Sequence, residues 1–173
     1  MRTRKAILPD APAIFNLISQ YTHDGTLLPR TLQEICENVR DFIVVEEKGK
    51  VLACAALHFY GLSLAEVRSV TVDRTAQGRS VGTKLVQGMI EESRAHRIDR
   101  LFLFTRTPEF FAKLGFVAVP NHILPEKVHK DCIACPRREH CDETAMVLGE
   151  EEAALAMTTA SDAYNPLRVL NAE

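Results

Sequence analysis

The sequence contains no tryptophan, few aromatic residues, little net charge and no long hydrophobic run. A formal net charge of −2 provides no general attraction for nucleic acid or for an anionic membrane, so any anionic ligand must be held by local cations. No apolar stretch reaches transmembrane length, and the basic residues 1–5 are not followed by the hydrophobic region of a signal peptide. These absences predict a cytoplasmic protein without nucleic-acid or membrane partners.

The five cysteines are an odd number and are unevenly spaced, so they do not indicate a disulfide framework. The length of 173 residues is sufficient for one domain with a proper hydrophobic core. We therefore expect a single domain over residues 1–149. Residues 150–173 are rich in alanine and acidic side chains, and we expect them to form a helical or disordered tail without chemistry.

Hydrophobic periodicity predicts strands that alternate with helices. Helices are expected after Asp10 and Thr31, which can cap them, over residues 81–96, and from Pro108 to Gly115. A hairpin is expected around Lys48-Gly49, and a long loop over residues 120–143. The predicted strands are residues 3–8, 42–46, 51–60, 64–72, 101–104, 116–119 and 144–148. This order predicts an α/β (α+β) fold with a mixed sheet and helices on both of its faces.

The most informative stretch is residues 64–83, LAEVRSVTVDRTAQGRSVGT. A β-branched run ends in a polar turn, and a second apolar pattern with helical spacing follows. The first amides of a helix lack internal partners and carry partial positive charge, so such a turn can bind a pyrophosphate. The turn matches neither the dinucleotide fingerprint nor a Walker loop.

The pattern V-x-x-x-x-Q-x-x-S-x-G in this stretch resembles the acetyl-CoA signature of the GNAT acetyltransferases, with Ser80 where a glycine is common. Serine is a favourable helix N-cap, so we expect its hydroxyl to contribute there. The resemblance implies a GNAT-type, largely antiparallel central sheet and acetyl-CoA as co-substrate. It also implies a main-chain contact between the strand and the pantetheine arm. The implied acetyl-CoA-binding residues are Ser69, Val70, Val72, Gln77, Gly78, Arg79, Ser80, Val81, Gly82 and Thr83.

Glu66 is the candidate general base. It matches the strand glutamate with which several GNAT enzymes take a proton from the amine, directly or through water. The alternation of a strand places Glu66 and Arg68 on one face. The alternative interpretation is an ion pair between these two residues on a solvent-facing strand.

The proton donor is not identified by the resemblance. Many GNAT enzymes carry a tyrosine that protonates the leaving thiolate, in a pattern like Y-x-K-L-G-F, but this chain has Phe111 at that position. A phenylalanine cannot donate a proton, so water, the new ammonium group or another residue must do so. Tyr60 and Tyr21 have no sequence support for this role.

The acceptor site resembles that of N-acetylglutamate synthases in two segments. Residues 104–116, FTRTPEFFAKLGF, are similar to their T-R-T-x-x-(W/F)-F segment, and residues 27–31, LLPRT, are similar to their loop that ends in arginine before a helix. The resemblance makes Arg30 and Arg106 carboxylate binders, with Arg68 and Lys127 as weaker candidates. A guanidinium can bind a carboxylate through two hydrogen bonds, which suits a dicarboxylate such as glutamate. For each cation the alternative is a solvated surface charge.

The segment over residues 129–141 contains Cys132-x-x-Cys135 followed by His140-Cys141. A pair of cysteines with a third cysteine and a histidine can form a tetrahedral zinc site. In this chain the second pair of ligands, His140 and Cys141, is adjacent in sequence and not separated by two residues. The alternatives are free thiols in a packed loop, which we favour, and a redox pair.

The resemblance implies an acetyltransferase that moves acetyl from acetyl-CoA to the α-amine of L-glutamate, the entry step of arginine biosynthesis, by direct attack in a ternary complex. Another small amine or amino acid is an alternative acceptor, and a non-catalytic module that senses acyl-CoA is an alternative function. The family also makes a homodimer plausible. Longer synthases carry an additional amino-acid-kinase-like domain, and we expect none within these residues.

Overall fold

The computed structural model describes residues 1–151 and 154–155. The chain folds as two compact units, Met1–Leu103 and Phe104–Glu173. Most of the predicted tail over residues 150–173 lies outside the described residues. Within the described part, no helix is both long and apolar enough to cross a membrane.

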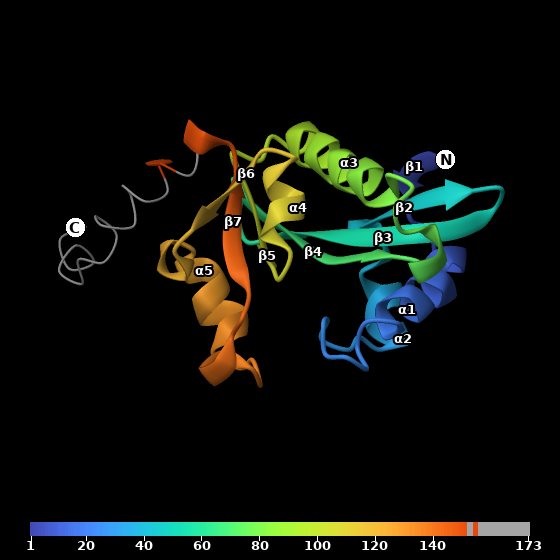
Figure 1. Cartoon of the computed structure of the whole chain (residues 1–173), viewed down its shortest axis with the longest axis horizontal. Helices are drawn as coiled ribbons and strands as arrows, with labels where there is room; N and C mark the ends of the chain where they lie inside the picture. Colours follow the sequence, from blue (N-terminus) through green and yellow to red (C-terminus); the bar gives the residue numbers. More distant parts are fainter. Residues whose placement is uncertain (152–153, 156–173) are drawn as a thin grey trace. The chain divides into compact units, whose positions relative to one another are not determined.

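The first unit is built on a sheet with strand order β1-β2-β3-β4-β5 (Figure 1). The first three pairings are antiparallel, and only the pairing of β4 with β5 is parallel. The strands are β1 (Arg2–Lys5), β2 (Phe42–Glu47), β3 (Lys50–Phe59), β4 (Leu64–Val72) and β5 (Arg100–Thr105), the last of which continues into the second unit.

The helices of the first unit cover both faces of its sheet. Figure 1 shows α1 (Ala11–Ser19) and α2 (Leu32–Glu37) on one side of the strands and α3 (Val81–Ala95) on the other. Short 3₁₀ turns cover Leu8–Asp10, Val39–Asp41 and Arg74–Ala76. The predicted mixed, largely antiparallel sheet with helices on both faces is therefore confirmed.

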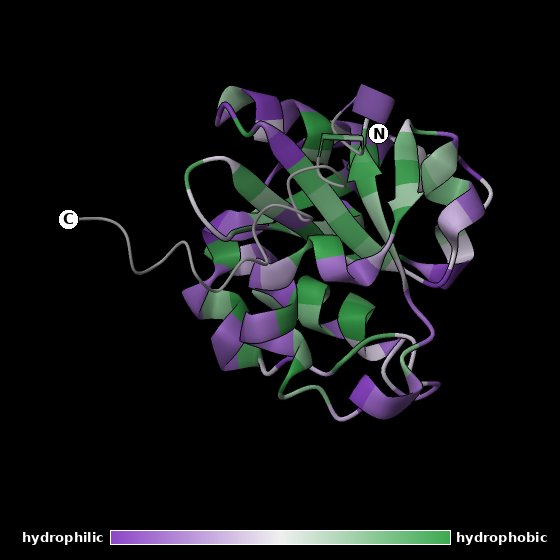
Figure 2. Cartoon of the chain, turned by 90° about the vertical axis from the view of Figure 1, so that its left-hand side faces the viewer, coloured by the Kyte–Doolittle hydropathy of each residue, from purple (hydrophilic) through white to green (hydrophobic). Residues whose placement is uncertain are grey.

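The core follows from the hydrophobic periodicity of the sequence. Hydrophobic residues are concentrated in the strands (Figure 2), and the predicted inner face of α3 is buried at Val81, Leu85, Val86, Met89 and Ile90. On the opposite face of the sheet, Ile14, Leu17 and Ile18 of α1 pack in one cluster with Ile35 of α2 and with Phe42 and Val44 of β2. Burial of this kind contributes about 25 cal/mol per Å² of apolar surface.

The first strand ends earlier than predicted, and the side chain of Asp10, at the N-cap position of α1, makes no capping hydrogen bond. Its carboxylate instead accepts hydrogen bonds from the Ile7 amide at 2.9 Å and from Arg4 Nη1 at 2.6 Å. These bonds turn the chain after Lys5 into the short 3₁₀ turn Leu8–Asp10, in whose first turn Pro9 lies. The strand prediction over residues 3–8 was therefore wrong at its end, where Ile7 and Leu8 are exposed.

We expect Asp10→Asn to lower the free energy of unfolding at neutral pH by roughly 2 kcal/mol, because it breaks a charged hydrogen-bond pair with little solvent access. Arg4 holds the pKa of Asp10 below its ordinary value, against the effect of burial, and the Ile7 amide adds to the lowering. The stabilisation is therefore complete above pH 4 to 5 and is lost as the pH falls through the depressed pKa.

Urea unfolding of Asp10→Asn between about pH 7 and pH 2.5 tests this linkage. The exposed Asp99→Asn is the control and should change stability by less than about 0.5 kcal/mol. An Asp10→Asn variant with the same free energy of unfolding as the wild type at pH 7 would contradict the stabilising role of the bond between Asp10 and Arg4.

The second unit contains a helix and a hairpin-like strand pair. The helix α4 (Pro108–Ala112) begins at the predicted proline, and Gly115, with a φ of 91°, follows its end. The predicted strands β6 (Phe116–Val119) and β7 (Thr144–Leu148) are present, and they pair antiparallel with Phe116 opposite Leu148.

The segment between these two strands is not the plain loop that its sequence predicted. It forms short helical turns, although it carries few residues with helical hydrophobic spacing. The turns are Asn121–Ile123, α5 (Pro125–Lys127), a π turn over Val128–Cys132, and Arg138–His140.

Candidate active site

A β-bulge interrupts the central strand β4. Cys54 of β3 pairs with Thr71 and Ala56 pairs with Arg68, so Ser69 and Val70 together stand opposite one residue of β3. Ser69 has a φ of 55°, in the left-handed region that non-glycine residues rarely adopt. A bulge leaves backbone groups out of the ladder and redirects side chains, and bulges are enriched beside active sites. The bulge lies at two of the predicted pantetheine-binding positions, Ser69 and Val70.

Glu66 lies on the face of the sheet that α1 and α2 cover. Its partner across the ladder is His58, which alternates with Cys54 and Ala56 of the core cluster on that face. Glu66 is only 3% exposed, which is unusual for a carboxylate. The solvent-facing strand of the alternative interpretation is therefore wrong, although the ion pair that it assumed is present.

The carboxylate of Glu66 is held by two neighbouring side chains. Arg68 donates to Glu66 Oε2 from Nε at 2.9 Å and from Nη2 at 2.6 Å, and the Tyr60 hydroxyl donates to the same oxygen at 3.0 Å. The prediction that Glu66 and Arg68 share a face is confirmed. Because the charge of Glu66 is balanced by Arg68, burial of the carboxylate is tolerated.

Arg30 lies at the bulge. Its Nε donates to Ser69 Oγ at 3.0 Å, which joins the loop before α2 to β4. The position of Arg30 is set by the next residue, Thr31, which is the predicted cap of α2. Glu34 N donates to Thr31 Oγ1 at 3.1 Å, and Thr31 N donates to Glu34 Oε2 at 2.7 Å. This capping box fixes the chain directly after Arg30.

The turn between β4 and α3 leads into the N-terminus of α3, where the sequence predicts a pyrophosphate site. The first intrahelical bond runs from Lys84 N to Ser80 O at 3.1 Å, so the amides of Val81, Gly82 and Thr83 precede the helical ladder. Gly78 has a φ of 74°, and a Cβ placed there would meet no atom within 4 Å. Bare amides at the positive end of a 15-residue helix suit a pyrophosphate.

The prediction that the Ser80 hydroxyl caps α3 was wrong. Ser80 occupies the N-cap position of α3 in a left-handed conformation, with a φ of 59°, and its hydroxyl makes no capping hydrogen bond. The reason is geometric: an effective N-cap has extended backbone, which directs its side chain to the amides two or three residues later.

Two predicted residues of this turn contact the rest of the first unit through their side chains. Gln77 Nε2 donates to the Tyr21 hydroxyl at 2.8 Å, and that hydroxyl donates to Val72 O. Arg79 Nη2 pairs with Glu47 at 2.6 Å. These bonds hold the turn against the segment that follows α1 and against β2, and they use the two side chains and not the backbone amides of the turn.

We expect Gly78→Val to raise the KM for acetyl-CoA about tenfold, because a β-branched residue in the left-handed region costs roughly 1–2 kcal/mol and distorts the turn. Initial rates at varied acetyl-CoA measure the effect. Gly78→Asn is the matched control, since asparagine tolerates that conformation and should raise KM much less. Equal KM values for the wild type and the Val variant would exclude a backbone role for this turn.

The remaining predicted acceptor residues belong to the second unit. Arg106 Nε pairs with Asp142 at 2.6 Å, directly after β5. Lys127 Nζ pairs with Asp131 at 3.0 Å and lies 5.8 Å from the centroid of the Phe104 ring. Both cations therefore have anionic neighbours within their own unit, which a substrate carboxylate would have to replace.

Phe111 packs in the interior of the second unit, where it is 4% exposed and contacts the rings of Phe110 and Phe116 edge-on. It has no polar atom to donate a proton. Tyr60, in contrast, lies beside Glu66, although neither a motif nor a spacing in the sequence indicated this position.

The cysteine segment does not form a metal site in the part of the chain that the structure describes. No three histidine, cysteine or acidic side chains lie together there as metal ligands, and Cys132, Cys135 and Cys141 are free thiols. Burial is the main cause that raises the pKa of Cys132. In this arrangement the cysteines and His140 are not gathered as the ligands that the zinc alternative requires.

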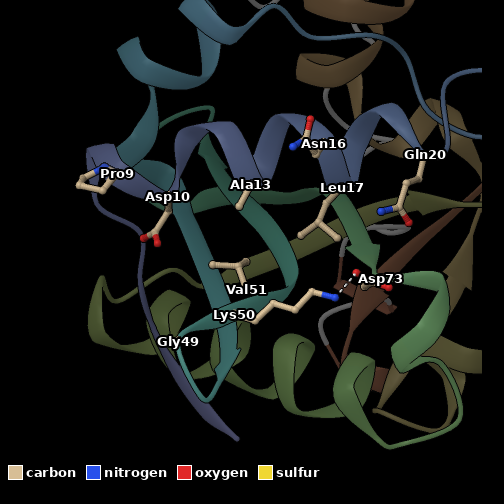
Figure 3. A pocket seen from close by; sticks show the side chains of 10 residues that line it. All are labelled: Pro9, Asp10, Ala13, Asn16, Leu17, Gln20, Gly49, Lys50, Val51 and Asp73. Carbon is tan, nitrogen blue, oxygen red and sulfur yellow. Dashed lines mark ion pairs between the residues drawn. The ribbon is translucent and has the colours of Figure 1, made fainter.

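A cavity of about 420 Å³ lies apart from these residues, against α1 (Figure 3). Ala13, Leu17 and Val51 form apolar parts of its wall. Its charged side chains are already compensated, since Lys50 pairs with Asp73 at 3.2 Å and Asp10 with Arg4. None of the predicted site residues lines this cavity, so it is not the candidate active site.

Comparison with known proteins agrees with this geometry. The model of the acetyltransferase (GNAT) family matches residues 11–116, which include the bulge, the turn and the whole of α3. An uncharacterized N-acetyltransferase of Chlorobaculum tepidum is 35% identical over 144 residues, which are 83% of this chain and 93% of that protein. The amino-acid acetyltransferase of Mycobacterium tuberculosis is 35% identical over 119 residues, 67% of this chain and 68% of that protein.

A solved structure is similar in both fold and sequence. It is the N-acetylglutamate synthase of Neisseria gonorrhoeae complexed with coenzyme A and N-acetyl-glutamate, with a TM-score of 0.76 and 30% identity. The match covers 85% of this chain and 34% of the synthase, so this chain corresponds to about a third of that protein. The family match, the two relatives and this fold lead to one conclusion: the chain belongs to the GNAT family of acetyltransferases, which use acetyl-CoA.

Proposed function

We propose that this enzyme transfers acetyl from acetyl-CoA to the α-amine of L-glutamate, the first step of arginine biosynthesis. The observation that carries the proposal is the position of Arg30, which is bonded to Ser69 in the bulge, three residues from the buried Glu66. A forked cation beside a buried base can hold the carboxylate of an amino acid while its amine reacts. The similarity to an amino-acid acetyltransferase and to a synthase complexed with N-acetyl-glutamate supports the same acceptor.

The chemistry is direct attack in a ternary complex. The acceptor amine attacks the thioester carbon, its C–N bond forms, and the C–S bond breaks as the tetrahedral intermediate collapses. Glu66 takes the proton that the amine loses, directly or through a water molecule, and the thiolate leaves to be protonated by water or by the ammonium group. Holding both reactants in line supplies much of the rate enhancement.

An acyl-enzyme on cysteine does not fit this site. Cys54 is the cysteine on β3 beside β4, where it contacts Thr71 Oγ1 at 3.0 Å, and it is fully buried. Burial raises the pKa of Cys54 to about 12, so its thiolate, the nucleophilic form, is scarce at neutral pH. The proposal therefore assigns no covalent step to the protein.

Arg68 contributes to the site through Glu66. Its Nε donates to Glu66, and its Nη2 donates to both Glu66 and Tyr60. We therefore place Arg68 as the partner of the base. Arg30 and Arg106 are the carboxylate binders of the proposal, and Lys127 is a weaker candidate.

We expect Arg106→Ala to raise the KM for glutamate at least tenfold and the KM for acetyl-CoA less than threefold, because a lost charged hydrogen bond costs about 1.5–3 kcal/mol. Steady-state kinetics with each substrate varied in turn measures both values. The exposed Arg138→Ala is the control, with both constants expected near the wild type. A parallel rise in the two KM values would argue against acceptor binding by Arg106.

The proposal is tested by measuring thiol release from acetyl-CoA with each of the twenty amino acids separately. A signal with glutamate far above all others supports it. Strong activity with another amino acid keeps the acetyltransferase chemistry and removes the role in arginine biosynthesis. Release with none of them would point to a different small amine as acceptor.

A further inference from the structure

Tyr60 stands directly after β3, at the start of the turn that leads into β4. Its backbone amide donates to Leu64 O at 2.9 Å, which closes the turn. Its hydroxyl lies 2.7 Å from Arg68 Nη2 and 3.0 Å from Glu66 Oε2. The three side chains therefore form a closed hydrogen-bonded triangle, since Arg68 also bonds to Glu66.

The direction of each bond in this triangle is fixed by chemistry. A guanidinium has only donors, so Tyr60 must accept from Arg68, and its own proton is then directed to the carboxylate. Three hydrogen bonds converge on Oε2 of Glu66, two from Arg68 and one from Tyr60. Convergence of charged and neutral donors on one oxygen restricts rotation of the carboxylate.

The ring of Tyr60 is itself held in place. It lies 5.5 Å from the ring centroid of Phe102 and 5.0 Å, edge to face, from that of His58. Arg68 Cζ is 5.8 Å from the centroid of the same ring. Both Phe102 and His58 pair with Glu66 across the ladder, so the strands that carry Glu66 also fix Tyr60.

We propose that Tyr60 is a positioning residue for the reaction: together with Arg68 it orients the carboxylate of Glu66 for proton abstraction from the acceptor amine. The inference rests on the proposed role of Glu66 as the base, but not on the identity of the acceptor. It assigns a function to a tyrosine remote in sequence from the position that Phe111 occupies. The hydroxyl acts through Glu66 and transfers no proton to the leaving thiolate.

Tyr60→Phe tests the inference, because it removes the hydroxyl and keeps the ring contacts. We expect kcat to fall at least about tenfold, as for a displaced catalytic group, with the KM for acetyl-CoA changed less than twofold. The melting temperature should change little, since the ion pair of Glu66 and Arg68 remains. A kcat within twofold of the wild type would overturn the proposal.

Tyr21→Phe is the matched control. It also removes one phenolic hydroxyl of the first unit, but that hydroxyl bonds to Val72 O and Gln77 at the acetyl-CoA turn. We expect the opposite of the result for Tyr60→Phe: a raised KM for acetyl-CoA and a kcat within about threefold of the wild type. If both variants lowered kcat equally at unchanged KM, a general structural effect would replace the positioning role.

A double-mutant cycle with Glu66→Gln separates this proposal from the role of Glu66. If Tyr60 acts through Glu66, Tyr60→Phe lowers kcat in the wild type but has little further effect in Glu66→Gln. Independent, multiplying effects would overturn the proposal. A Glu66→Gln variant with normal kcat would instead show that Glu66 is not the base. The positioning role of Tyr60 would then fall as well, because it depends on Glu66. All variants are assayed with the amino acid that gives the highest wild-type rate.

Discussion

Glu66→Gln lowers kcat by about 100-fold or more at saturating substrates, which is the loss typical of a removed general base. The amide keeps the size of the side chain and an oxygen that accepts from Arg68, so both KM values should change little, although loss of the charge beside Arg68 lowers the free energy of unfolding. It cannot take a proton from the amine. Steady-state rates at pH 7 to 8, with circular dichroism to confirm folding, measure the effect.

Glu46→Gln is the matched control for that variant. Glu46 is also a strand glutamate paired with an arginine, Arg4, at 2.8 Å, but it belongs to β2 and has no proposed role in the reaction. Its kcat should stay within twofold of the wild type. A Glu66→Gln enzyme that also stays within twofold would end the assignment of Glu66 as the base.

Arg30→Ala raises the KM for the amino acid by about 10- to 100-fold and leaves the KM for acetyl-CoA within threefold of the wild type. Removing a charged donor from a bound carboxylate costs about 1.5–3 kcal/mol, which is the reason for this size. Inhibition by the N-acetylated product should weaken by a similar factor, because the product keeps the carboxylate.

Two further variants serve as controls for Arg30→Ala. Arg30→Lys keeps the charge but loses the forked geometry, so its KM should lie between those of the wild type and the Ala variant. The exposed Arg40→Ala, in the 3₁₀ turn after α2, should leave both KM values unchanged. If Arg30→Ala raised both KM values equally, Arg30 would act on the turn or the fold instead of on the acceptor.

Much of the fold was predictable because it follows from periodic patterns. The inner face of α3, the hairpin around Lys48-Gly49 and the capping box at Thr31 depend on neighbours a few residues apart, and the structure shows all three. The common face of Glu66 and Arg68 follows from strand alternation in the same way. These elements depend on local chemistry that one sequence displays.

The features that shape the site depend on contacts between distant residues. The bulge at Ser69 depends on the register between β3 and β4, and no residue near it is a glycine that would indicate a positive φ. The hydrogen bond between Asp10 and Arg4 ends β1, and the sequence did not indicate it either. Asp10 stands directly before a helix, where an aspartate is ordinarily a helix cap. Tyr60 meets Glu66 only when the turn between β3 and β4 closes.

The most direct test of the proposed function compares glutamate with glutamine as acceptors. Glutamine has nearly the same shape and the same α-carboxylate, but it lacks the second negative charge. We predict that kcat/KM for glutamate exceeds that for glutamine at least about tenfold, with N-acetylglutamate as the product identified by mass spectrometry. An equal or higher kcat/KM for glutamine would contradict the proposal that the arginines of this site select a dicarboxylate.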